Sequence, residues 1–131
     1  MRVMVVPVLA TTALACTVIA AGQARPASLP VVYDCADVAV TQPASLTPTC
    51  ADLGEHLSGL TWTRWDEEAA AGTGTEHRKT CVPDCATGPV AQRPVTVRLS
   101  GPHGSPAVFT RLRVTDAAGD TADFLLPVGP G

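Results

Sequence analysis

The amino-acid sequence predicts an all-β protein, a small antiparallel β-sandwich or barrel of six to seven short strands held together by disulfides. Three observations lead to this fold class. Apolar and polar residues alternate along several short runs, as in strands with one buried face. Twelve prolines and eleven glycines separate these runs and disfavour long helices. Four cysteines follow an apolar N-terminus, a pattern typical of small exported domains.

The first 24 residues have the features of a cleavable signal peptide. Arg2 is the only charged side chain among them, and residues 3–22 are uncharged and largely apolar. Small residues at 20–24 suit a signal peptidase, with cleavage after Gly22 or, preferably, after Ala24. The alternative is a retained membrane anchor, because an apolar stretch of about 20 residues can span a bilayer.

Cys16 allows a second alternative, in which the protein is a membrane-tethered lipoprotein. Residues 12–16 loosely resemble a bacterial lipobox, whose cysteine carries the lipid. Leu14 is a poor match to that pattern, and residues 17–21 stay apolar where a lipoprotein turns polar. We therefore expect Cys16 to be an ordinary signal-peptide cysteine. A membrane is a partner only if Cys16 is lipidated or the signal is retained.

Beyond the signal, the sequence predicts a flexible leader over residues 25–30 and a single β domain over residues 31–131. The leader contains two prolines, and the remaining length suffices for one domain. The whole chain has a formal net charge of −3. Because Arg2 is the only charge in the signal, the exported part is more acidic still. An acidic domain has no general attraction for nucleic acid or anionic lipid, so neither is expected as a partner.

The four cysteines of the domain, Cys35, Cys50, Cys81 and Cys85, predict two disulfides. An even number of cysteines in a small exported chain indicates disulfides, because the compartment that such a chain enters is oxidising. Three pairings are possible, and we favour Cys35–Cys50 and Cys81–Cys85 because each joins neighbours along the chain. The Val-Pro-Asp sequence at 82–84 is well suited to the turn that the second pair requires.

A metal site is the competing interpretation of these cysteines. His77, Cys81 and Cys85 are evenly spaced, and His56 could complete a set of four ligands. Structural zinc sites use two closely spaced cysteine pairs, whereas this chain offers one, and export favours oxidation of the thiols. A thiol-redox role is disfavoured because the spacing is not Cys-x2-Cys. The sequence therefore predicts no metal and no cofactor.

Short strands are expected in the first half of the domain at residues 31–33, 38–40 and 45–47, and residues 51–56 could form one helical turn. Residues 57–65 have the pattern of a longer strand. Strict alternation along this strand places Trp62 on one face and Trp65 on the other. If Trp65 lies on the outer face, it is a candidate anchor for a ligand or partner, because exposed aromatic side chains often take this role.

The second half of the domain has the clearest alternation. An acidic turn at 66–68 precedes a strand within residues 69–80, whose small residues suit packing beneath the tryptophan rings. Two alternating runs follow at 95–100 and 108–115, separated by a turn at 101–106, and a further turn at 116–120 leads into an extended segment at 122–126. Short turns between such runs predict antiparallel hairpins.

The sequence predicts no catalytic residue. His56, His77 and His103 could each serve a nucleophile, but no Gly-x-Ser-x-Gly motif accompanies them. The adjacent carboxylates at 66–68 would point to opposite faces of a strand and could not act as a pair. A small hydrolase is therefore only a minor alternative.

Six segments carry a resemblance to known proteins: 33–35 (Tyr-Asp-Cys), 60–65 (Leu-Thr-Trp-Thr-Arg-Trp), 72–75 (Gly-Thr-Gly-Thr), 81–86 (Cys-Val-Pro-Asp-Cys-Ala), 94–97 (Pro-Val-Thr-Val) and 109–112 (Phe-Thr-Arg-Leu). Together they resemble a group of small exported proteins of unknown function from actinobacteria. The likeness covers most of the domain. It implies an extracellular β domain and brings no activity with it.

A shorter likeness involves Cys35 and Cys50, followed by Ala-Asp-Leu at 51–53. This segment resembles the first disulfide region of secreted subtilisin inhibitors of the Streptomyces type. In that family a second disulfide, between well-separated cysteines, holds an exposed reactive loop. Cys81 and Cys85 are too close together to reproduce it.

These observations predict an exported, non-enzymatic β domain that binds a cell-envelope component or another secreted protein. The main alternative is a secreted serine-protease inhibitor, which would present an exposed loop at residues 82–93.

Overall fold

The computed structural model describes residues 15, 17, 22 and 27–130, and in this part the chain forms seven strands and no helix. The all-β prediction is therefore confirmed. The predicted signal peptide over 1–24, including Cys16, lies outside the described residues apart from the three isolated positions, as do residues 25 and 26 of the leader. The described residues contain no helix with the length and apolar character needed to cross a membrane.

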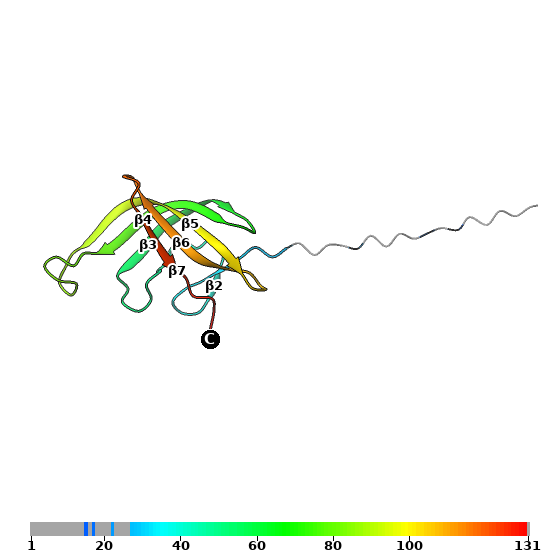
Figure 1. The fold of residues 1–131 in the computed structure, drawn as a ribbon, viewed down its shortest axis with the longest axis horizontal. Helices are drawn as coiled ribbons and strands as arrows, with labels where there is room; N and C mark the ends of the chain where they lie inside the picture. Colours follow the sequence, from blue (N-terminus) through cyan, green and yellow to red (C-terminus); the bar gives the residue numbers. More distant parts are fainter. Residues whose placement is uncertain (1–14, 16, 18–21, 23–26, 131) are drawn as a thin grey trace, which may run out of the picture.

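A five-stranded antiparallel sheet forms the body of the domain. Its strands are β3 (Glu55–Trp65), β4 (Ala70–Lys79), β5 (Val90–His103), β6 (Val108–Asp116) and β7 (Thr121–Leu125). They lie side by side in chain order, each antiparallel to the one before it. Figure 1 shows the sheet arching over the segment that carries β2. The sheet thus has a concave inner face and a convex outer face.

The N-terminal segment covers the inner face as a second layer. It contains β1 (Val32–Tyr33) and β2 (Ala39–Val40), which pair antiparallel. Single bridges attach this segment to β6, through Val31 and Val108, and to β3, through Leu46 and Leu57. The segment therefore crosses the sheet from β6 to β3, which gives the two-layer packing of a small sandwich.

The core lies between these two layers. The apolar residues of β5 and β6 that alternate in the sequence are buried there, because successive side chains of a strand point to opposite faces. The core cluster consists of Val32, Leu46, Leu57, Leu60, Ala70, Val95, Val97, Leu99, Phe109, Leu112, Val114 and Leu126.

Several elements begin or end at other residues than the sequence predicts. β3 already begins at Glu55, and residues 51–52 form a turn, so the helical turn considered for 51–56 is absent. Residues 45–47 contribute a single bridge rather than a strand. β5 runs through His103, so the connecting turn occupies residues 104–107 instead of 101–106. Pro30, expected in the flexible leader, is buried. The limits of β5 follow from its pairing with β4 and β6, which continues beyond the alternating run.

Two irregularities in β3 change which way its side chains face. The pairing of β3 with β4 shifts register between Ser58 and Thr61, and again between Trp62 and Arg64. Each shift breaks the strict alternation of side chains. As a result, both indole rings pack against the core, and the ring centroids of Trp62 and Trp65 are 4.8 Å apart in an edge-to-face contact. The prediction that the two tryptophans face opposite ways is wrong.

The glycines of β4 make room for the irregular course of β3. A Cβ atom on Gly74 would lie 2.7 Å from Leu60 Cδ2 and 2.8 Å from the Ser58 carbonyl oxygen. A Cβ on Gly72 would meet the Thr61 carbonyl oxygen even more closely. The small residues predicted for this strand are therefore required by the close approach of the neighbouring backbone.

Both disulfides have the pairing that the sequence favoured. Cys35 and Cys50, with Cα atoms 5.4 Å apart, join the two ends of the segment that contains β2. Cys81 and Cys85, with Cα atoms 3.9 Å apart, close the beginning of the loop between β4 and β5. Disulfides of this kind persist in an oxidising environment, which is the setting that the structure supports for this domain.

Candidate functional site

The tryptophan proposed as a ligand anchor packs against the core. Trp65 is half-buried, its ring centroid lies 5.5 Å from that of Phe109, and its Nε1–H donates a 2.9 Å hydrogen bond to the carbonyl oxygen of Pro30. The indole thus attaches the N-terminal segment to the sheet. Its role as an anchor required a position on the outer face. The structure instead turns Trp65 toward the core.

The predicted histidines divide into a pair and a single residue. His56 and His77 are direct cross-strand partners on the outer face of β3 and β4. Ser58 Oγ forms a 2.7 Å hydrogen bond with His77 Nε2, but the described hydrogen bonds of His77 include none to a carboxylate. His103 is exposed at the end of β5. A serine and a histidine are thus brought together, without the third group that orients such a pair in hydrolases.

The metal site considered from the cysteine spacing does not form. Cys81 and Cys85 are bonded to one another and so cannot act as thiolate ligands. The part of the chain that the structure describes holds no group of three or more His, Cys, Asp or Glu side chains arranged around one point.

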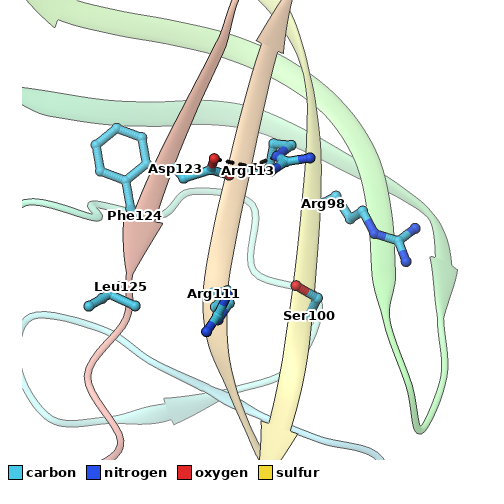
Figure 2. A pocket seen from close by; sticks show the side chains of 7 residues that line it. All are labelled: Arg98, Ser100, Arg111, Arg113, Asp123, Phe124 and Leu125. Atoms are coloured by element: carbon cyan, nitrogen blue, oxygen red, sulfur yellow. Dashed lines mark hydrogen bonds and ion pairs between the residues drawn. The ribbon is translucent and has the colours of Figure 1, made fainter.

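A groove lined with arginines lies on the outer face, across β5, β6 and β7. Its volume is about 290 Å³, and Figure 2 shows the side chains around it. The register places Arg98, Arg113 and Asp123 in one row across the three strands, and Ser100, Arg111 and Leu125 in the next. Phe124 completes the lining. We call this feature the arginine groove.

Only one arginine of the groove is neutralised within it. Arg113 donates two hydrogen bonds to Asp123, at 2.7 and 3.1 Å, and this contact lowers the pKa of Asp123 below its usual value. Arg98 and Arg111 take part in none of the ion pairs found among the described residues. All three arginines are exposed. The groove therefore presents two guanidinium groups free to bind an anion.

This clustering of positive charge works against folding. Arg98 and Arg113 are direct cross-strand partners, and like charges in this position destabilise a sheet. In Figure 2 the Arg98 side chain extends away from Arg113, which keeps the two guanidinium groups apart. An anion in the groove would relieve the repulsion. Guanidinium groups suit this task because their planar N–H donors match carboxylate and phosphate oxygens.

The groove was not predicted from the sequence, although part of its signal is visible there. Arg98, Arg111 and Arg113 occupy outward positions of the two alternating runs. Their meeting in one patch depends on the register between β5 and β6, which alternation within a single strand does not reveal.

A second charged cluster lies on the inner face of the sheet, beyond the apolar core, and its two glutamates are buried. Glu76 is fully buried and forms ion pairs with Arg78 and Arg93, while Arg93 also binds Asp116 at 2.6 Å. Glu55 accepts a 3.0 Å hydrogen bond from Arg78. This glutamate cluster extends the inner face beyond the apolar core and connects β3 to β6 through charged side chains.

One atom of the glutamate cluster lacks a partner. Glu55 is only 4% exposed, and its Oε1 is buried without a hydrogen bond from any described residue. Burial, followed by interaction with Glu76, raises the pKa of Glu55 to about 7. Burial alone would also raise the pKa of Glu76, but hydrogen bonds from Glu55 and Arg93 lower it. A proton on Glu55, donated toward Glu76, accounts for both observations. The two glutamates are buried and contact Arg78 and Arg93, so the cluster is a structural feature.

The loop between β4 and β5 is the exposed segment that an inhibitor would use. Residues 81–87 are exposed, as the inhibitor alternative expected for part of its 82–93 segment, whereas residues 90–93 belong to β5. The loop is folded on itself: Asp84 accepts hydrogen bonds from the amides of Ala86 and Thr87, and its carbonyl accepts one from Gly88.

Comparison with known proteins finds no matching family model, no matching curated protein and no matching solved structure.

Proposed function

We propose that this protein is an exported, non-enzymatic β domain that binds an anionic component of the cell envelope, or an acidic secreted partner, through the arginine groove. The two disulfides support work in an oxidising compartment. The five-stranded sheet, with the N-terminal segment packed on its inner face, supplies the scaffold. The groove supplies a surface whose charge is opposite to that of the chain as a whole.

The observation that carries this proposal is the pair of free guanidinium groups of Arg98 and Arg111, beside the like-charged cross-strand pair of Arg98 and Arg113. A carboxylate opposite Arg98 or Arg111 would stabilise the sheet, as Asp123 does opposite Arg113. The charge excess lowers stability in the free domain and becomes favourable when an anion is bound. It also steers an anionic partner toward the groove.

The test is a titration with two polyanions of different chemistry. Polyphosphate represents the phosphate groups of an envelope polymer, and polyglutamate represents an acidic protein segment. The double variant Arg98→Ala/Arg111→Ala should weaken binding by about tenfold for each arginine removed, the equivalent of one charge-assisted hydrogen bond. Lys79→Ala, an exposed charge outside the groove, is the matched control and should bind like the parent.

The choice of polyanion identifies the source of the partner. Preference for polyphosphate supports an envelope polymer, and preference for polyglutamate supports a secreted protein. Affinity should fall as salt is added, and less steeply for the double variant, because fewer counterions are released. Failure of the parent to bind either polyanion, or equal binding by the double variant, would overturn the proposal.

A secreted serine-protease inhibitor is the second candidate, and the exposed loop at 81–87 supports it. An inhibitor would lower subtilisin activity in proportion to its concentration, and the loop would survive or be cut at one site. Inhibition that disappears after replacement of the loop, and persists in the arginine double variant, would select this candidate over anion binding.

A further inference from the structure

Two histidines face each other on the outer face, away from the arginine groove. His56 of β3 and His77 of β4 are directly opposite in the register, and their ring centroids are 5.8 Å apart. Both side chains are half-buried. Two imidazoles held this closely on adjacent strands can approach one ion together.

Hydroxyl groups on both sides orient the two rings. Thr47 Oγ1 forms a 2.9 Å hydrogen bond with His56 Nδ1, and Ser58 Oγ forms a 2.7 Å hydrogen bond with His77 Nε2. Each bond occupies one ring nitrogen, and the described residues form no hydrogen bond with the other, Nε2 of His56 and Nδ1 of His77. Partners of this kind fix the ring orientation and the tautomer of histidines that bind metals.

A third residue lies in the same row. Gln92 of β5 is the direct partner of His77 and is exposed, so its side-chain amide is on the same face as both imidazoles. An amide oxygen is a weak additional ligand, and water would occupy the remaining positions. A tetragonal set of nitrogen and oxygen ligands is the arrangement that Cu(II) and Ni(II) favour.

We propose that His56 and His77 form a two-imidazole binding site for a divalent transition-metal ion, with Cu(II) bound most tightly. Imidazole suits copper, nickel and zinc, and affinity among these ions is highest for copper. The oxidising environment indicated by the disulfides maintains copper in its divalent form. The site has two strong ligands, fewer than a structural zinc site, and is therefore a surface site for exchangeable metal.

The test uses the disulfide-bonded chain and Cu(II) alone. Calorimetric titration should give one equivalent of Cu(II) per chain, and electron paramagnetic resonance of that complex should show coupling to two imidazole nitrogens. His56→Gln and His77→Gln should each lose this binding, whereas His103→Gln, at an isolated exposed histidine, should retain it. Ser58→Ala should weaken binding by about tenfold, the usual effect of removing a group that orients a ligand.

Circular dichroism of each variant shows that the fold is kept. A double variant, His56→Gln/His77→Gln, that still binds one equivalent of Cu(II) would overturn the proposal, because the metal would then be held elsewhere, for example by the terminal amine. Loss of binding in His103→Gln would overturn it in the same way. Absence of imidazole coupling in the parent complex would do so without any substitution.

Discussion

Replacement of Glu55 by glutamine should flatten the pH dependence of this domain's stability. Glu55 is 4% exposed at the start of β3, and its buried Oε1 has no hydrogen-bond partner among the described residues. Burial is the main cause that raises its pKa from 4.5 to about 7, and interaction with Glu76 adds to it. The folded chain therefore holds a proton that the unfolded chain releases above pH 4.5.

The sign of the effect follows from this difference in proton binding. Between pH 4.5 and 7 the folded state binds more protons than the unfolded state, so the free energy of unfolding falls as the pH rises. The stabilisation from Glu55 is complete below pH 4.5 and is lost as the pH passes through about 7. The difference in pKa corresponds to a loss of about 3 kcal/mol, an upper value for this one group. The lowered pKa of Glu76 acts in the opposite direction at lower pH.

Urea unfolding, followed by tryptophan fluorescence at several values between pH 4.5 and 8.5, measures this dependence. The parent should lose stability across this range, and Glu55→Gln should lose much less, because a glutamine amide can donate to Glu76 at every pH. Glu67→Gln, at an exposed carboxylate in the turn after β3, is the matched control and should follow the parent.

An unchanged slope in Glu55→Gln would contradict a raised pKa for Glu55 in the folded state. It would show that Glu55 ionises in the folded state as it does in the unfolded state, and that Oε1 is satisfied by water. A slope of the opposite sign in the parent would mean that the paired carboxylates, rather than Glu55, dominate the titration.

Three further predictions concern the stability of the fold, and each is measured by urea unfolding. Gly74→Ala should cost about 1–3 kcal/mol, because the new Cβ would overlap the backbone of β3; no loss would show that β3 can move away. Trp65→Phe should cost about 1–3 kcal/mol, since it leaves the carbonyl of Pro30 without its donor; an unchanged midpoint would mean that water replaces the indole. Removal of the disulfide through Cys35→Ala/Cys50→Ala should cost about 3 kcal/mol, and a smaller loss would indicate a reduced chain that stays compact.

Much of the fold could be predicted because its strands leave a local signal. The runs at 95–100 and 108–115 alternate apolar and polar residues and lie in β5 and β6, and the turn at 116–120 indicated the strand that follows as β7. The disulfide pairing was predictable for a related reason: both bridges join cysteines that are close along the chain. For these elements a short range of sequence contains the physical cause.

The prediction for the tryptophans was wrong because their orientation depends on the pairing of β3 with β4, which the sequence of β3 alone does not contain. The register shift between Trp62 and Arg64 arises where β3 pairs with the glycines of β4, and it turns Trp65 toward the core. Alternation inside β3 alone cannot indicate where an extra residue interrupts the ladder. Trp65 therefore packs against the core and bonds the N-terminal segment instead of standing on the outer face.

The all-β class, the hairpin order and the local disulfides of this protein follow from its sequence, because the period, the turn residues and the cysteine spacing act over a few positions. Which charges meet depends on the packing of the whole domain. The register across β5, β6 and β7 assembled the arginine groove, and the register of β3 with β4 set His56 beside His77 and enclosed Glu55 with Glu76. These contacts join residues from different strands, and their energies depend on burial and distance, which arise only when the sheet closes over its core.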